Sequence, residues 1–308
     1  MQLNQIMNLT PGKECEPIAT GFQHLDHLTG GLRKGQLCTI AAPFRMDKTA
    51  FAVSLLRNIG VVQKVPTAYF SLEMNKEEIP RMLKASITGS WAPVPTPPVE
   101  VMNAMKTIGF HYQDTEQEAI QWIEEAPIWI EDDFEADIDE IVRRMEQLHR
   151  ENQVRLVIID SISLLMFGCN HEEQTKTIKK LQQTADRLKQ ALILTSAVNL
   201  SQEVNGECKR PRLSDLCNWE RIGPFSSIVM FVHRPEYYYF EILEDDCCSL
   251  VFEMTENDTT HLYRICDTFE DGTTAIDMAD IIVEKNNFGG TGFVRMHFDN
   301  HTGFREIL

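Results

Sequence analysis

Short apolar runs mark two predicted strands. Leu37 to Ala42 (LCTIAA) is an almost unbroken apolar run, and Arg155 to Ile159 (RLVII) is a second one that ends against Asp160. Runs of this length without polar alternation predict strands that are buried on both faces, as in a parallel sheet. We therefore expect two core strands at 37–42 and 155–159.

Other segments carry apolar residues at helical spacing. Ala50 to Leu56 (AFAVSLL) supplies an apolar helix face directly after the first strand. Residues 135–152 predict an amphipathic helix that leads into the second strand, with apolar positions at Ile138, Ile141, Val142, Met145 and Leu148. Strands that alternate with helices are typical of an α/β fold, with a twisted, mostly parallel sheet flanked by helices.

The remaining segments suggest how the domain is organised. Residues 1–18 are polar and contain proline and glycine, so they predict a flexible lead-in to one domain at 19–308. Ser90 to Pro98 (SWAPVPTPP) predicts a proline-rich surface loop. Residues 236–280 are acidic and aromatic, and we interpret them as a β-hairpin-type insertion near the C-terminal end.

Composition agrees with one cytoplasmic domain. The 308 residues, of which 43% are hydrophobic, suffice to bury a single α/β core. No stretch resembles a signal peptide or is apolar for long enough to span a bilayer, so we expect a cytoplasmic protein with no membrane partner. The eight cysteines form no CxxC pair and no Cys/His spacing suited to zinc, which predicts free, reduced thiols.

The segment between the first strand and helix resembles a phosphate-binding loop. Ala41 to Thr49 reads AAPFRMDKT. In such a loop the backbone N–H groups of a glycine-rich turn face the phosphates, a lysine reaches the outer phosphates, and Ser or Thr holds Mg²⁺. Lys48 and Thr49 keep the last two roles, and the candidate nucleotide-binding residues are Ala42, Pro43, Phe44, Arg45, Met46, Asp47, Lys48, Thr49 and Ala50.

Asp47 replaces the glycine that precedes the lysine of this loop. We expect Asp47 to lack the conformational freedom of glycine and to repel phosphate, unless Arg45, Lys48 or a metal compensates its charge. Nucleotide affinity should therefore fall. An Asp-Lys-Thr triplet alone also fits an ordinary capped helix start, but the strand before it and the apolar helix after it favour the phosphate loop.

Four further strings carry a family resemblance. They are Thr20 to Gly35 (TGFQHLDHLTGGLRKG), Phe70 to Met74 (FSLEM), Leu156 to Leu165 (LVIIDSISLL) and Lys209 to Leu216 (KRPRLSDL). In this order they resemble the ATPase domain of bacterial replicative helicases of the DnaB type, in superfamily 4. The resemblance implies a RecA-like P-loop NTPase core, ATP and Mg²⁺ as cofactors, and ATP-dependent 5′-3′ DNA unwinding during replication.

The resemblance also implies roles for single residues. Glu73 matches the glutamate that activates the attacking water, and a carboxylate at a strand end suits a general base. Asp160 matches the carboxylate that positions Mg²⁺ through water, together with Thr49 as a metal ligand. A lone strand-terminal Asp is often only a cap, but this context favours the metal role. Lys285 matches a lysine that reaches the γ-phosphate bound by the neighbouring subunit.

Other positions depart from the pattern of the family. Ser196 to Leu200 reads SAVNL where the family has SQLNR, so Ala197 replaces the glutamine that senses the γ-phosphate. Asn287 stands at the arginine-finger position, and loss of such an arginine can lower the rate by roughly 10³ to 10⁵. Ser214 to Glu220 (SDLCNWE) and Gly223 to Ser227 (GPFSS) also differ from the family strings. We therefore expect weakened or lost hydrolysis.

Two segments lie where the central DNA-binding loops of the family lie. They are 171–180 and 204–212, and the candidate DNA contacts are Lys176, Lys179, Lys180, Lys209, Arg210 and Arg212. A solvated charged face is an equally good interpretation of both. The net charge of −17 argues against a broad basic surface, although charges on pore-lining loops act locally, within a Debye length of about 10 Å.

The resemblance implies partners that differ between two hypotheses. In the first, the chain is a helicase domain that forms a ring around single-stranded DNA. In the second, it is a catalytically inactive pseudo-helicase that binds a replicative helicase, its loader or another replication protein. The helical N-terminal collar domain of the family is expected to be absent, which weakens ring assembly in either case. Circadian-clock and recombinase ATPases share the core fold, but LTGGL and SLEM favour the helicase branch.

Overall fold

The computed structural model describes most of the chain between Glu16 and Ile307. The described residues are 16–43, 46–88, 112–132, 137–199, 210–234, 240–242, 251–256, 259–265, 277–299 and 302–307. Phe44, Arg45, Lys209 and the predicted loop Ser90 to Pro98 lie outside these ranges. No helix of the described segments is long and apolar enough to cross a membrane.

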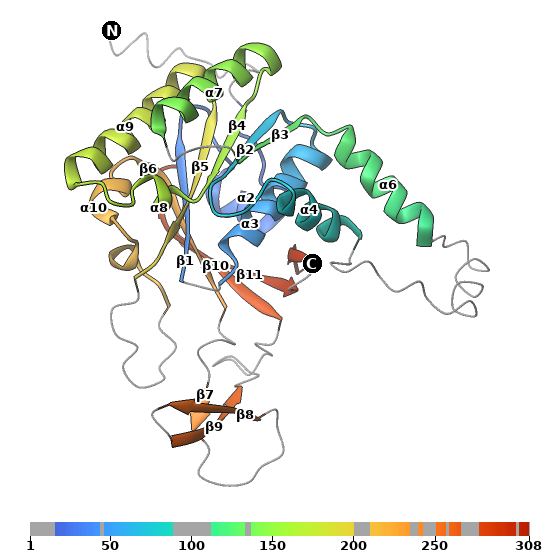
Figure 1. Ribbon diagram of the computed structural model, residues 1–308, viewed down its shortest axis with the longest axis vertical. Coiled ribbons are helices and arrows are strands. Elements are labelled where there is room, and N and C mark those ends of the chain that lie inside the picture. The colour runs from blue at the N-terminus through green and yellow to red at the C-terminus, as the bar shows by residue number, and fades with distance from the viewer. Residues whose placement is uncertain are drawn as a thin grey trace.

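A mixed sheet of nine strands forms the centre of the domain (Figure 1). Its strands are β1 (Leu37–Ala42), β2 (Thr67–Ser71), β3 (Ile128–Glu131), β4 (Leu156–Asp160), β5 (Ala191–Ala197), β6 (Ser226–His233), β10 (Met278–Asn286), β11 (Gly292–Asp299) and β12 (Gly303–Glu306). Their order across the sheet is β12-β11-β10-β6-β1-β5-β4-β2-β3. The strands from β6 to β3 are parallel, and β10, β11 and β12 are added antiparallel.

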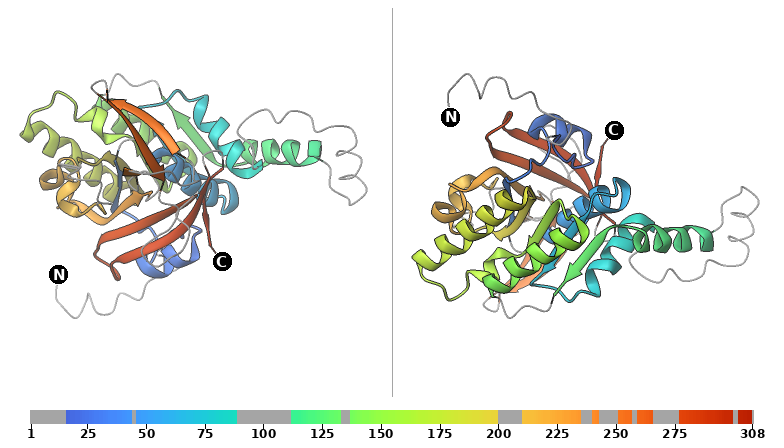
Figure 2. Two further views of the ribbon diagram at one scale, coloured as in Figure 1. Left: turned by 90° about the horizontal axis from the view of Figure 1, so that it is seen from below. Right: turned by 90° about the horizontal axis from the view of Figure 1, so that it is seen from above.

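Helices cover both faces of this sheet. They are α2 (Gln23–Thr29), α3 (Lys48–Leu56), the π-helical turns η2 (Arg57–Val62), α4 (Glu78–Thr88), α6 (Tyr112–Glu124), α7 (Ile138–Asn152), α8 (Ile162–Leu165), α9 (His171–Leu188), the 3₁₀ turn η3 (Leu213–Asp215) and α10 (Trp219–Ile222). One buried cluster joins α2, α3 and α4 to the sheet, and a second joins α7, α8 and α9 to its other face. Figure 2 shows these two groups of helices on opposite sides.

The predicted α/β fold class is confirmed by this sheet and its flanking helices. The first predicted strand matches β1 to the residue, and the second corresponds to β4, which ends at Asp160 as expected. The amphipathic helix is α7, in which Ile141, Val142, Met145 and Leu148 are buried. Parallel strands need crossover connections, and α3, α7 and α9 supply them.

A smaller antiparallel sheet lies within the predicted insertion 236–280. It consists of β7 (Phe240–Ile242), β8 (Val251–Glu256) and β9 (Thr259–Ile265), in the order β7-β9-β8, and it is drawn below the main sheet in Figure 1. The main sheet resumes with β10 at Met278, so the last residues of the range belong to the core. At the other end of the chain, Ile18 is buried and pairs with Leu32.

Candidate functional site

The candidate phosphate loop begins where β1 ends. Ala42 and Pro43 are buried, and the N–H of Met46 donates to the carbonyl of Pro43 at 3.2 Å. Asp47 precedes α3 with φ +59° and ψ +38°, in the left-handed region. Asp tolerates this region better than most residues. Asp47 therefore adopts a left-handed backbone conformation that glycine reaches more readily, and its lower conformational freedom remains a prediction.

The charge of Asp47 is compensated by a residue that the sequence analysis missed. The guanidinium of Arg234 forms an ion pair with the Asp47 carboxylate, and the Arg234 side chain is only 3% exposed. The N–H of Arg234 also donates to the Met46 sulfur at 3.5 Å. The compensating charge was expected from Arg45, Lys48 or a metal. The parallel pairing of β6 with β1 brings Arg234 to the loop. No local sequence pattern predicts this proximity.

Lys48 and Glu73 meet beside the same loop. The Lys48 ammonium donates to a Glu73 carboxylate oxygen at 2.7 Å, which joins the first residue of α3 to the turn after β2. Thr49 and Ala50 follow in the first turn of α3 and are half-buried. The predicted phosphate-binding lysine and the predicted general base therefore share one place at the carboxyl edge of the sheet.

Asp160 lies at the same edge, at the end of β4. Its side chain is buried, and its two carboxylate oxygens accept hydrogen bonds from the hydroxyls of Tyr69, at 2.8 Å, and Thr195. Burial and the neighbouring Asp160 raise the pKa of Tyr69 well above its usual value, so this phenol stays a donor. The Asp160 carbonyl accepts the N–H of Glu73 at 3.3 Å. The strand ends that carry the two predicted catalytic carboxylates are thus directly linked.

The predicted sensor position also lies next to the loop. Ala197 ends β5 and is the register partner of Ala42, and the N–H of Val198 donates to the Ala42 carbonyl at 3.1 Å. The backbone of this position therefore lies beside the start of the loop. Ala197 carries only a methyl group, which offers no hydrogen bond.

Lys285 and Asn287 lie at the opposite edge of the sheet. Lys285 is the register partner of Val229, and the N–H of Asn287 donates to the carbonyl of Ser227 at 2.9 Å, at the amino end of β6. The Lys285 ammonium donates to the Gly223 carbonyl at 2.8 Å, and burial lowers its pKa. The length of β1, roughly 3.3 Å per residue, separates this edge from the phosphate loop of the same chain. The structure therefore does not bring Lys285 together with Lys48, Glu73 and Asp160.

The first candidate DNA-binding segment is helical. Residues 171–180 form the first half of α9, which an Asn170 capping box begins. Lys176 pairs with Glu172 at 2.7 Å, Lys180 pairs with Asp139, and Lys179 is exposed. These contacts resemble those of a solvated helix face.

The second segment is described only from Arg210 onward. Arg210 forms an ion pair with Asp280, whose side chain is fully buried and also accepts from Arg295 at 3.0 Å. Arg212 is exposed before η3. Arg210 therefore has a structural role beside β10, while Arg212 remains open to solvent.

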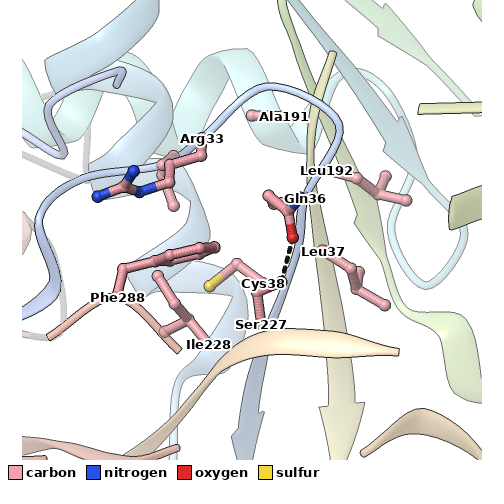
Figure 3. A pocket seen from close by; sticks show the side chains of 10 residues that line it. Arg33, Gln36, Leu37, Cys38, Ala191, Leu192, Ser227, Ile228 and Phe288 are labelled. Atoms are coloured by element: carbon pink, nitrogen blue, oxygen red, sulfur yellow. Dashed lines mark hydrogen bonds between the residues drawn. The ribbon is translucent and has the colours of Figure 1, made fainter. Parts of the chain in front are cut away.

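A small hollow lies at the amino edge of β1, β5 and β6 (Figure 3). Arg33 stacks over the Phe288 ring at 4.3 Å from its centroid, and Gln36 accepts from Ser227. Cys38 also lines the hollow, and burial raises the pKa of its thiol to about 12. This hollow is separate from the phosphate loop, which lies at the carboxyl edge of the same strands.

Comparison with known proteins identifies the family. The profile of the DnaB-like helicase C terminal domain matches residues 17–306. The chain belongs to the DnaB-like helicase family. A DnaB-like replicative helicase, solved to study its interactions with primase, aligns with a TM-score of 0.73 and 21% identity, over 99% of this chain and 66% of that chain. A solved ATPase domain aligns with a TM-score of 0.71 and 22% identity, over 99% of this chain and 95% of that chain.

Curated relatives of this DnaB-like domain are replicative DNA helicases. DnaB of Buchnera aphidicola subsp. Baizongia pistaciae is 26% identical over 302 residues, which are 95% of this chain and 56% of the relative. DnaB of Rhodothermus marinus is 32% identical over 212 residues, which are 65% of this chain and 21% of the relative. The chain thus spans little more than half the length of the first of these helicases.

Proposed function

We propose that this chain is a DnaB-like helicase domain in DNA replication that binds Mg-ATP and hydrolyses it slowly. The observation that carries the proposal is the convergence of Lys48, Thr49, Glu73 and Asp160 at one edge of the sheet. Lys48 contacts Glu73, and Glu73 follows a strand whose end is bonded to Asp160. A lysine, a hydroxyl and two carboxylates are the groups that phosphoryl transfer to water requires.

The residues of this edge fit Mg²⁺ and the phosphates of ATP. Oxygen ligands suit Mg²⁺, and the Thr49 hydroxyl would supply one, while the Asp160 carboxylate would hold the ion through its bound water. Tyr69 and Thr195 hold Asp160 in place, and its remaining lone pairs can accept from water bound to the ion. Bound Mg²⁺ neutralises charge that develops on the phosphates. Lys48 would turn from Glu73 to the outer phosphate, and Glu73 would then accept a proton from the attacking water.

Three substitutions support slow hydrolysis. Asp47 places a carboxylate in the loop, Ala197 has no group to sense the γ-phosphate, and Asn287 is neutral at the finger position. Lys285 and Asn287 lie at the edge away from their own loop, so they can serve only the loop of another copy. A domain at 19–308 that assembles in a ring around single-stranded DNA is consistent with this division, with 236–280 as its insertion.

A second candidate function is a catalytically inactive scaffold for a replicative helicase, its loader or another replication protein. The specific observation in its favour is the Asp47–Arg234 ion pair, which places a protein carboxylate where phosphate would bind. In this version the surface of the RecA-like domain binds the partner protein, and ATP binding and hydrolysis play no part. Partner binding would then be unaffected by Lys48→Ala.

Titration calorimetry with Mg-ATP, beside phosphate release stimulated by single-stranded DNA, tests the first proposal. We expect binding that Lys48→Ala removes, and slow release that Glu73→Gln removes. If the wild type neither binds nor hydrolyses Mg-ATP while Asp47→Gly does bind, the helicase activity is excluded and the scaffold remains. An Asp186→Asn variant serves as the control for the change in net charge, because Asp186 is exposed on α9.

A further inference from the structure

Arg234 contacts both the phosphate loop and β11. It forms the ion pair with Asp47, its N–H donates to the Met46 sulfur at 3.5 Å, and its guanidinium lies 3.9 Å from the centroid of the Phe298 ring. Asp47 and Arg234 are 187 residues apart in the sequence. The end of β6, the phosphate loop and β11 therefore converge on one guanidinium group.

Burial gives this guanidinium a strong need for an anion. The Arg234 side chain is 3% exposed, whereas Asp47 is 34% exposed, so the anion lies on the solvent side of the cation. A buried cation is costly without a charged or hydrogen-bonding partner. A guanidinium recognises carboxylate and phosphate oxygens with the same planar set of donors. A phosphate that enters the loop can therefore take the place of the Asp47 carboxylate.

We propose that Arg234 is a phosphate-binding residue of this chain and that Asp47 is its tethered anion, which an incoming polyphosphate displaces. The inference rests on the nucleotide site proposed above and adds a residue to it. Lys48 is paired with Glu73 in the same way. Among the described residues at the loop, Lys48 and Arg234 are thus each held by an internal carboxylate, and a polyphosphate has enough negative charge to replace both carboxylates.

The experiment is a double-substitution cycle with inorganic tripolyphosphate, titrated without Mg²⁺ at low salt. The proteins are the wild type, Asp47→Asn, Arg234→Gln and the double variant. We expect Asp47→Asn to raise the affinity at least tenfold when Arg234 is present, and less than threefold when it is replaced by Gln. An equal gain in both backgrounds, or no gain in either, would overturn the inference, because Asp47 would then act by general repulsion or not at all.

Two controls keep the test decisive. Asp186→Asn makes the same charge change on exposed α9, and we expect it to leave the affinity unchanged. Thermal unfolding reports whether Arg234→Gln is folded. If it is not, Arg234→Lys replaces it in the cycle, because lysine keeps the positive charge. In the Arg234→Lys background we expect the affinity gain from Asp47→Asn to be at least threefold smaller than in the wild type, because an ammonium lacks the planar fork. An undiminished gain contradicts the inference.

Tripolyphosphate separates this inference from the proposed function. It needs neither hydrolysis nor recognition of a base, so slow or absent ATP turnover does not affect the result. Binding that Lys48→Ala abolishes, but that shows no coupling between Asp47 and Arg234, overturns only the inference. If no variant binds either tripolyphosphate or Mg-ATP, the proposed nucleotide site itself is wrong.

Discussion

The Lys48 ammonium donates a 2.7 Å hydrogen bond to the Glu73 carboxylate, so the cation of the phosphate loop and the predicted general base hold each other. Both side chains are partly exposed, at 19% and 34%. The contact is therefore within reach of solvent and of an entering phosphate. In the proposed function, Glu73 would be released when Lys48 turns from it to the phosphate, so nucleotide binding would free the general base.

We predict that Glu73→Gln separates binding from hydrolysis. The amide no longer holds Lys48 by charge, so Mg-ATP should bind several-fold tighter, while phosphate release falls by roughly 10² to 10⁴ because the base is lost. Titration calorimetry and a phosphate-release assay measure the two effects. Glu77→Gln is the matched control, since Glu77 is exposed six residues after β2 and should change neither. Weaker Mg-ATP binding by Glu73→Gln would contradict the proposal that Lys48 leaves Glu73 when it binds the phosphate.

A second prediction concerns the edge of the sheet that carries Asn287. Asn287→Arg should raise the ATPase rate by up to about 10³, because a finger arginine stabilises charge in the transition state. The effect should act between copies. Asn287→Arg combined with Lys48→Ala in one chain is inactive alone, yet should activate wild-type chains when the two are mixed.

The steady-state ATPase rate of such mixtures, plotted against their composition, checks this prediction. Gln183→Arg adds the same charge on the exposed face of α9 and should have no effect. A gain that appears only when Asn287→Arg and an intact Lys48 are in the same chain would show that the finger acts within one copy.

A third prediction is a loss of stability in acid. Burial and the charge of Arg210 lower the pKa of His233 from 6.5 to about 3. Between these two values the unfolded chain binds a proton that the folded chain excludes. Stability is therefore unaffected by His233 above pH 6.5 and falls by up to about 1.4 kcal/mol per pH unit as the pH drops from 6.5 towards 3.

Urea unfolding between pH 4 and pH 8 measures this slope. His233→Gln should flatten it, whereas His297→Gln should not, because His297 is exposed. An unchanged slope in His233→Gln would assign the acid sensitivity to other groups.

The fourth prediction separates two of the basic residues first considered as DNA contacts. Asp280→Asn should destabilise the fold by about 3–5 kcal/mol, since it removes the buried anion that Arg210 and Arg295 share. Arg210→Gln should likewise lower the melting temperature and leave the salt dependence of DNA binding unchanged.

Lys179→Gln should leave stability unchanged and, if α9 contacts DNA, reduce the slope of log K against log salt by about 1. Fluorescence anisotropy with single-stranded DNA at several salt concentrations measures the slope, and a change in slope for Arg210→Gln would restore it as a DNA contact.

Local patterns predicted the elements of the core well. LCTIAA and LVIID are strands because their apolar side chains have no polar alternation, and the apolar spacing of α7 matches its buried face. The position of Asp160 at a strand end followed from the sequence for the same reason. What could not be predicted depends on pairing between distant segments. Arg234 follows an ordinary apolar strand, and only the register of β6 with β1 places it against Asp47.

The backbone of Asp47 escaped prediction for another reason. Replacement of glycine removes conformational freedom on average, but a single Asp can take up a left-handed conformation when its side chain is anchored. The helical state of 171–180 was also not predicted, because the resemblance placed this segment at a DNA-binding loop of the family. In the structure Thr177, Ile178, Leu181, Thr184 and Ala185 of α9 are buried at helical spacing.

The phosphate loop and Asn287 lie at opposite edges of the sheet, so one copy of this chain would present its loop to one neighbour and Asn287 to the other. In a mixed ring with an intact helicase, its loop would receive an arginine from one neighbour, while the loop of the other neighbour would receive only an amide. A single copy would therefore slow hydrolysis at the nucleotide site of only one of its two neighbours. The residual ATPase rate of the ring would then depend on the order of the subunits as well as on their ratio.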